Sequence, residues 1–215
     1  MKRTILALSC LLATAGANAA PISSEADPSL SGGTLIDFEA GPIGTWVTQS
    51  FSGLAVTAIN STYASSATFS VDGDYAGSYN TRGRYHITNH GSEFQSLRFD
   101  FSSPTSAFGF LFGASDSSWV LNAYNAGGLL ESLTIPAVFG SNAGDFFGLA
   151  NLSGATYAAL IQNQDGPYAT GGVDYVFVDN FRLVGGNNNV PEPASLALMG
   201  LGLAGLAALR RRKFA

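Results

Sequence analysis

Short apolar segments that alternate with polar residues recur through the middle of the chain, and this period limits the fold more than any other feature. Residues 54–59 (LAVTAI) and 119–124 (WVLNAY) alternate with a period of two. A period of two places one set of side chains on a single face of a β-strand, whereas an α-helix needs a period of 3.6. The body of the chain offers no window of a dozen residues with a helical period and helix caps. The sequence therefore predicts an all-β domain.

About ten short strands of this kind, joined by Gly, Ser, Asn and Asp turns, predict an antiparallel β-sandwich of jelly-roll type. The break at Ser103-Pro104 separates two of them, and the Asn125–Gly128 turn predicts a hairpin. The domain is expected over residues 34–185, with linkers at 20–33 and 186–190. The remaining predicted strands are 35–39, 97–101, 108–112, 129–135, 157–161 and 173–184.

The first 19 residues have the three parts of a secretory signal peptide. Lys2 and Arg3 form a positive start, residues 5–12 are apolar, and Ala17-Asn18-Ala19 is a small-x-small cleavage site. The only cysteine, Cys10, lies within this segment. We therefore expect an exported chain that starts near Ala20, uses the Sec translocon and signal peptidase, and has no disulfide.

The last 25 residues combine a proline-flanked acid, an apolar run and a basic cluster. Pro191-Glu192-Pro193 precedes residues 194–209, which carry no charge. As a helix this run would cover roughly 24 Å, a little less than the hydrocarbon core of a bilayer. The four cations that follow predict a single transmembrane helix whose end faces the cytoplasm. These orienting residues are Arg210, Arg211, Arg212 and Lys213.

The order of these three parts resembles the PEP-CTERM sorting signal of exported bacterial proteins. The resemblance covers residues 191–215 and implies cleavage near Pro191, Glu192 and Pro193 by an exosortase, a membrane-embedded transpeptidase-like enzyme. It also implies a Gram-negative host that makes exopolysaccharide and biofilm matrix, with the product at the cell surface or in that matrix. Because proline denies the backbone helical hydrogen bonds, the tripeptide would stay extended and open to a protease. A plain single-span anchor is the alternative interpretation.

The charge of the body excludes some partners. Residues 20–190 contain four arginines, no lysine and fourteen acidic residues, which gives a formal charge of about −10. Such a surface does not bind nucleic acid or anionic lipid by general electrostatics.

The motifs of common catalytic sites do not occur in this sequence. It has no Gly-x-Ser-x-Gly elbow, and His86 and His90 would lie roughly 13 Å apart on a strand, too far to share a metal. A carboxylate pair for glycoside hydrolysis stays open, because such residues meet only in the folded protein. The leading expectation is therefore a protein without enzymatic activity.

Two groups of residues predict binding sites. Asp37 and Glu39 in the first predicted strand and Asp179 in the last resemble the structural calcium site of jelly-roll carbohydrate-binding modules, and their oxygens suit Ca²⁺. Solvent-facing acids are the simpler interpretation of the same residues. A glycine-rich stretch also gathers aromatic rings and cations that could stack on and bond a polysaccharide. These are Tyr75, Tyr79, Arg82, Arg84 and Tyr85.

The sequence thus predicts an exported, non-enzymatic surface or matrix protein that binds polysaccharide. A hydrolase acting on matrix polysaccharide and a purely structural matrix component are the alternatives.

Overall fold

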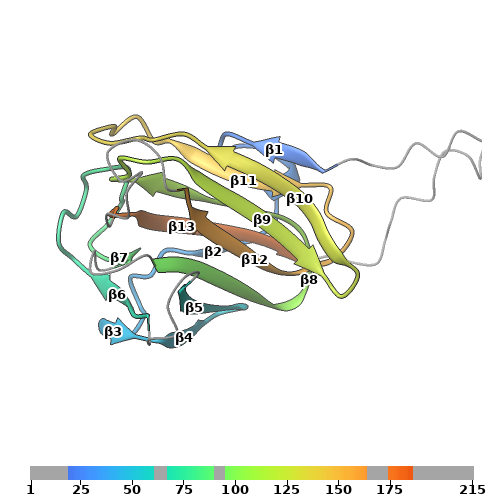
Figure 1. Ribbon diagram of the computed structural model, residues 1–215, viewed down its shortest axis with the longest axis horizontal. Helices are drawn as coiled ribbons and strands as arrows, with labels where there is room; N and C mark the ends of the chain where they lie inside the picture. The colour runs from blue at the N-terminus through green and yellow to red at the C-terminus, as the bar shows by residue number, and fades with distance from the viewer. Residues whose placement is uncertain (1–18, 61–66, 90–94, 164–173, 186–215) are drawn as a thin grey trace, which may run out of the picture. The chain divides into compact units, whose positions relative to one another are not determined.

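The computed structural model describes residues 19–60, 67–89, 95–163 and 174–185, which belong to a compact unit spanning Asn18–Gly186. The described residues form an all-β structure with one short 3-10 helix, η1 (Pro28–Leu30). Thirteen antiparallel strands join in a single sheet that makes a sandwich-like fold (Figure 1). This confirms the predicted all-β antiparallel class, while the jelly-roll type stays a prediction.

Strand β8 (Gln95–Gly113) is the longest element, and its two halves pair with different neighbours. The first half pairs with β5 (Leu54–Asn60) and β12 (Ala155–Gln162). The second half pairs with β11 (Phe146–Ala150) and β13 (Phe177–Gly185). β8 therefore belongs to both parts of the sheet.

The middle of β8 is sharply bent. The ring centroids of Phe99 and Phe110 lie 5.6 Å apart, although eleven residues of straight strand would separate them by about 36 Å. The register of β12 on β8 shifts across the same region. The sequence predicts a break at Ser103-Pro104; the structure has a continuous strand that bends there, where proline offers no N–H to a ladder.

The other strands extend from this centre. On the side of the first half, β12 continues to a hairpin of β9 and β10, and β5 pairs with β4. On the side of the second half, β13 pairs with β2 and β7, β7 continues to β6 and β3, and β11 pairs with β1. Their bounds are β1 (Ala20–Ile22), β2 (Thr34–Ile36), β3 (Gly44–Trp46), β4 (Thr48–Phe51), β6 (Phe69–Asp72), β7 (His86–Thr88), β9 (Trp119–Asn125) and β10 (Gly128–Ile135).

Alternation along the second half of β8 buries both of its faces. Phe108, Phe110 and Phe112 enter the main core. There the ring of Phe181 stacks on those of Phe108 and Phe110 and also contacts Phe99, in the first half of β8. Ala107 and Leu111 point the other way, into a smaller apolar cluster. Besides these two residues, that cluster contains Ile22, Leu30, Phe146 and Ala150.

The segment 20–33 differs from its predicted role as a linker. Ile22 in β1 is 1% exposed and Leu30 in η1 is 3% exposed, and both pack in the smaller cluster. β1 also pairs with β11 in register from Ala20 to Ile22. The segment is therefore part of the folded domain. Residues 1–18 of the predicted signal peptide lie outside the described residues. The predicted linker at 186–190 lies outside them too.

Candidate functional site

The outer face of β6, β7 and β13 carries the polar and aromatic side chains from which a site is built. Val71, Ile87 and Val178 point into the main core. Because side chains alternate along a strand, their neighbours face outward. The register pairs Asp72 with His86 and Thr88 with Phe177, so these residues share this outer face.

The segment of residues 73–85, which connects β6 to β7, carries most of the remaining site residues. It contains three non-glycine residues with a left-handed backbone: Tyr75 (φ 65°), Tyr79 (φ 52°) and Asn80 (φ 65°). This conformation costs energy for residues with a Cβ and persists where surrounding contacts hold it.

Asn80 is one of the contacts that hold this segment. Its Nδ2 donates to the carbonyl of Phe112 (2.9 Å) and to Asp145 Oδ2 (2.8 Å). Its Oδ1 accepts from the amide of Gly144 (2.7 Å), and its own amide donates to Asn142 Oδ1 (3.1 Å). The segment is thereby tied to the end of β8 and to the chain before β11.

Two acidic residues hold the end of the same segment by accepting from its main chain. Asp179 Oδ2 accepts from the amide of Arg82 (2.6 Å), and Glu39 Oε1 accepts from the amides of Arg84 (2.5 Å) and Tyr85 (2.9 Å). Asp179 is fully buried. Burial raises the pKa of Asp179 to about 7. The hydrogen bonds that it accepts from the amides of Arg82 and Asn180 oppose this shift, and the charges of Glu39 and Asp37 add to it.

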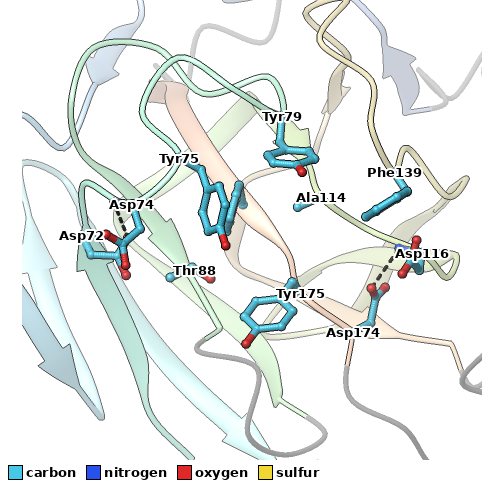
Figure 2. A pocket seen from close by; sticks show the side chains of 11 residues that line it. Asp72, Asp74, Tyr75, Tyr79, Thr88, Ala114, Asp116, Phe139, Asp174 and Tyr175 are labelled. Carbon is cyan, nitrogen blue, oxygen red and sulfur yellow. Dashed lines mark hydrogen bonds between the residues drawn. The ribbon is translucent and has the colours of Figure 1, made fainter.

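Between segment 73–85, the outer face and three further connecting segments lies a pocket of about 300 Å³ (Figure 2). Asp72 and Asp74 lie on one side of it, and Asp116 and Asp174 on the other (Figure 2). Its lining is Asp72, Asp74, Tyr75, Tyr79, Thr88, Ala114, Asp116, Phe139, Asp174, Tyr175 and Phe177.

Four aromatic side chains of the pocket form one connected cluster, and Tyr175 is a further lining ring. Phe177 is buried, and its ring centroid lies 5.6 Å from that of Tyr75 and 5.8 Å from that of Tyr79. Tyr79 also contacts Phe139 at 6.2 Å. Tyr75, Phe139 and Tyr175 are 61%, 64% and 51% exposed, which leaves much of their ring surface open to a ligand.

The wall on the Asp174 side is held by a single buried carboxylate. Asp174 accepts hydrogen bonds from both the amide and hydroxyl of Ser117, the hydroxyl of Ser115, the indole N–H of Trp119 and the amide of Asp116. It is 1% exposed. These bonds fix the turn before β9 and so define this side of the pocket.

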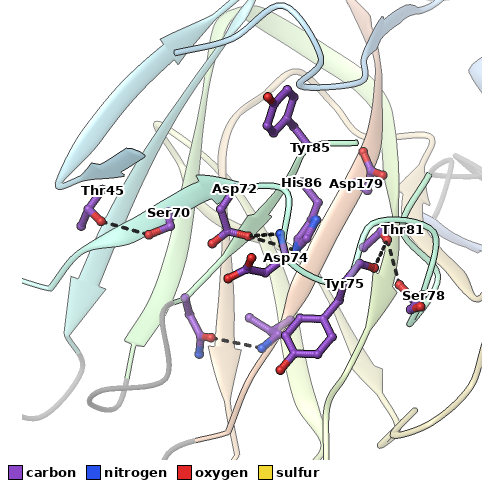
Figure 3. Close-up of polar contacts among 12 residues, drawn as sticks. Thr45, Ser70, Asp72, Asp74, Tyr75, Ser78, Thr81, Tyr85, His86 and Asp179 are labelled. Atoms are coloured by element: carbon purple, nitrogen blue, oxygen red, sulfur yellow. Dashed lines mark hydrogen bonds and ion pairs between the residues drawn. The ribbon is translucent and has the colours of Figure 1, made fainter. Parts of the chain in front are cut away.

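Two buried polar side chains lie beneath the opposite side. Thr88 is 5% exposed, and its Oγ1 has no hydrogen-bond partner in the described part of the chain. The ring centroid of His86 lies 4.4 Å from that of Phe177, with an interplanar angle of 53°. The Nε2 of His86 lies 3.6 Å from Asp72 Oδ1 (Figure 3). Burial lowers the pKa of His86 to about 4, although the charge of Asp74 opposes the shift, so His86 is neutral near pH 7 and this contact is not an ion pair.

The structure separates the predicted ligand-binding residues. Tyr75 and Tyr79 line the pocket, whereas Arg82, Arg84 and Tyr85 do not. Arg82 forms an ion pair with Glu25 (2.6 Å), and the guanidinium of Arg84 lies 5.0 Å from the ring centroid of Tyr85.

Several lining residues were missed by the sequence analysis. Phe139 and Tyr175 lie far from segment 73–85 in the sequence and carry no local motif. The pair Asp174-Tyr175 repeats the Asp74-Tyr75 pair, and such a repeat of acidic and aromatic residues could have drawn attention to it.

The predicted calcium residues come close to one another, but they already have other contacts. Asp37, Glu39 and Asp179 interact electrostatically, while Asp37 Oδ1 accepts from the amide of Glu39 (3.2 Å). Among the described residues, no group of three or more His, Cys, Asp or Glu side chains is arranged to hold a metal ion. The calcium site stays a prediction.

The predicted sorting residues Pro191, Glu192, Pro193 and Arg210–Lys213, and the predicted transmembrane helix, lie outside the described residues. Within the described ranges, no helix has the length and apolar character needed to cross a membrane.

The solved structures to which this chain is similar are distant from it. The carbohydrate-binding module TmCBM61, in complex with beta-1,4-galactotriose, is 14% identical, with 70% of this chain and 94% of that chain covered and a TM-score of 0.38. A family 29 carbohydrate-binding module is 12% identical, with 75% and 98% covered and a TM-score of 0.34. A cycloisomaltooligosaccharide glucanotransferase from Paenibacillus sp. is 12% identical, with 70% and 18% covered and a TM-score of 0.36.

No curated protein matches the chain. A family model does match its C-terminal part. The model describes the PEP-CTERM protein-sorting motif and covers residues 189–213, which include the Pro-Glu-Pro tripeptide, the apolar run and the basic cluster. The predicted resemblance is thereby confirmed: the chain carries a PEP-CTERM protein-sorting motif.

Proposed function

We propose that this chain is an exported, non-enzymatic protein of the cell surface or extracellular matrix whose β-domain binds a glycan in the pocket beneath segment 73–85. An exosortase processes its C-terminus after the Sec translocon and signal peptidase have acted on the N-terminus. The proposal joins two independent features, the sorting motif and the pocket.

The open aromatic rings of the pocket carry the binding part of this proposal. Sugar rings present flat C–H faces and a rim of hydroxyl groups, so their sites combine aromatic faces with a few placed polar groups. Tyr75, Tyr175 and Phe139 supply exposed rings, while the carboxylates around them can accept hydrogen bonds from hydroxyls. The backbone that positions Tyr75 and Tyr79 is held by Asn80, Glu39 and Asp179, so little ordering remains to be done on binding.

Glycan-array binding followed by calorimetry tests this part. Tyr75→Ala and Tyr79→Ala should each weaken binding about tenfold, since removing a central aromatic contact costs more than about 1 kcal/mol. Tyr124→Ala is the matched control: Tyr124 is a half-buried tyrosine stacked on Tyr157, outside the pocket lining. Equal affinity of all three variants and the wild type would remove the pocket from the proposal.

The processing part is tested by intact mass in the native cells. The mature protein should lack residues 1–19 and 196–215, with a new end near Pro191-Glu192-Pro193. Replacing the tripeptide with alanines should block cleavage and leave the protein in the membrane fraction, because the apolar run and basic cluster remain. A native protein that retains Arg210–Lys213 would instead be a plain membrane anchor.

Hydrolysis is the second candidate function, because carboxylates lie on both sides of the pocket, Asp72 and Asp74 facing Asp116 (Figure 2). Glycosidases use two carboxyl groups that flank the scissile bond. Release of shorter products from a bound glycan, lost in Asp116→Asn, would establish this function. Binding without products supports the non-enzymatic proposal, and a domain without any glycan ligand would be a structural matrix component.

A further inference from the structure

We propose that the sugar bound in this pocket carries a protonated amine, so that the ligand is a basic glycan such as a polymer of de-N-acetylated amino sugars. This inference rests on the proposed glycan-binding function and names the class of glycan.

The charge of the lining favours a cation. Four aspartates line the pocket, and its described lining contains no lysine or arginine. The four arginines of the body have partners elsewhere: Arg82 and Arg182 lie next to Glu25, Arg98 binds Asp100, and Arg84 lies over Tyr85. His86, behind Phe177, is neutral near pH 7. The field in the pocket is therefore negative, and it opposes uronic acids and other anionic sugars.

The arrangement of the rings also suits a cation. Tyr75 and Tyr79 meet edge to face, with an interplanar angle of 77°, and both contact Phe177 beneath them. An ammonium group gains from each ring face that it approaches, and Tyr75, which is 61% exposed, offers it such a surface. A neutral hydroxyl group gains less from a ring face than a cation does.

Thr88 supplies an independent sign that a polar group belongs in the pocket. Thr88 lines the pocket, and its Oγ1, which is buried beneath that lining, has no hydrogen-bond partner in the described residues. A buried hydroxyl without a partner is costly, and a ligand N–H or O–H that reaches it would remove that cost. Asp74 lies on the same side of the pocket and is exposed at its rim, so an ammonium group can approach a hydroxyl oxygen and a carboxylate there (Figure 2).

The test compares three β-1,4-linked tetrasaccharides that differ only in the group at C2: glucosamine, N-acetylglucosamine and glucose. Calorimetry at pH 6 keeps the amine charged, because an amine of this type has a pKa of roughly 7 to 8. The glucosamine tetramer should bind on the order of tenfold more tightly than the other two, and the preference should shrink in 0.5 M salt.

A charge variant and a peptide probe complete the test. Asp74→Asn keeps the shape of the side chain and should weaken binding of the glucosamine tetramer about three- to fivefold, with binding of the glucose tetramer unchanged. Tetralysine should bind at least about tenfold more weakly than the glucosamine tetramer, because it lacks the sugar face that stacks on tyrosine.

Each other outcome overturns the inference in a distinct way. Equal affinity for the three tetrasaccharides keeps glycan binding and removes the selectivity for an amine. Binding of tetralysine as tight as that of the glucosamine tetramer makes the pocket a cation or peptide site. No binding of the glucosamine tetramer, in a protein that binds another glycan on the array, rejects the basic glycan alone; no binding of any glycan rejects the proposed function as well.

Discussion

Two buried aspartates, five residues apart, hold different segments of the chain near the pocket: Asp174 holds the turn before β9, and Asp179 holds the end of segment 73–85. Asp174 accepts five hydrogen bonds, four from the turn before β9 and one from the indole of Trp119 at the start of β9. Asp179 accepts two, both from main-chain amides, and the charges of Asp37 and Glu39 lie nearby. A buried carboxylate is stabilised in its charged form by the donors around it. The comparison teaches that equally buried carboxylates can play different parts: Asp174 forms a firm wall with five donors, whereas Asp179 is an anchor with two donors and a pKa raised to about 7.

The largest expected effect comes from removing the firm wall. Asp174→Ala leaves the indole N–H of Trp119 and the amide of Ser117 buried without an acceptor. We expect a loss of about 3–5 kcal/mol in the free energy of unfolding and a fall of about 10 °C or more in melting temperature. Asp174→Asn, which keeps one acceptor, should lose less. A loss below about 1 kcal/mol in Asp174→Ala would show that the network contributes little.

Calcium binding would affect only the anchor formed by Asp179. An ion bound by Asp37, Glu39 and Asp179 would stabilise the native state by about 2.7 kcal/mol at a hundredfold excess over its Kd. Because the pKa of Asp179 is about 7, the rise in melting temperature over a chelated sample should be larger at pH 8 than at pH 6, and absent in Asp179→Ala. Identical melts with calcium and with chelator at pH 8 would end the calcium prediction.

The pH dependence of stability separates Asp179 from His86. The folded pKa of Asp179, about 7, is above its unfolded value of 3.8, so its contribution is greatest below pH 4 and is lost as pH rises toward 7. The folded pKa of His86, about 4, is below its unfolded value of 6.5, so stability is lost as pH falls from 6.5 to 4. In the wild type the two slopes oppose each other.

His86→Leu should remove one of these slopes. Urea unfolding of this variant should show stability rising as pH falls from 7 to 4.5, by at most about 1.4 kcal/mol per pH unit. The double variant with Asp179→Asn should lose this rise. A slope that is the same in the single and double variants would mean that Asp179 titrates alike in the folded and unfolded states.

The smallest effect on stability is expected at the ligand surface. Tyr75 is 61% exposed and is held in a left-handed conformation, so Tyr75→Ala should change the free energy of unfolding by less than about 1 kcal/mol. Thermal melts of this variant check that its loss of glycan binding does not come from unfolding. A larger loss of stability would place Tyr75 with the anchors and not with the ligand surface.

Much of the fold could be predicted because its signals are local. The hairpin of β9 and β10 follows from alternation on both sides of Asn125–Gly128, and Gly128 has the positive φ (116°) that suits glycine. β1 and η1 could not be found in this way, because three-residue elements are too short for a period. Ile22 and Leu30 look like isolated apolar residues until the second face of β8 brings them together.

The site could be predicted only in part, for the same reason. Tyr75 and Tyr79 lie in a stretch whose composition indicates a binding loop, but Tyr175 and Phe139 reach it only through the sheet topology. The sequence shows that Asp179 is an acid in an apolar strand. It does not show that its partner is the amide of Arg82, 97 residues earlier.

Strand β13 connects the pocket to the sorting segment in a way that has a mechanical consequence. Phe177 begins the strand at the pocket, Gly185 ends it, and the sorting motif starts at residue 189. A pull between a bound glycan and the C-terminal end of the chain would load this one strand along its length. β13 is paired on one side with β8 and on the other with β2 and β7, so rupture would require several ladder hydrogen bonds to shear together. The same load applied to β1, which among the described strands pairs with β11 alone, would break far fewer at once.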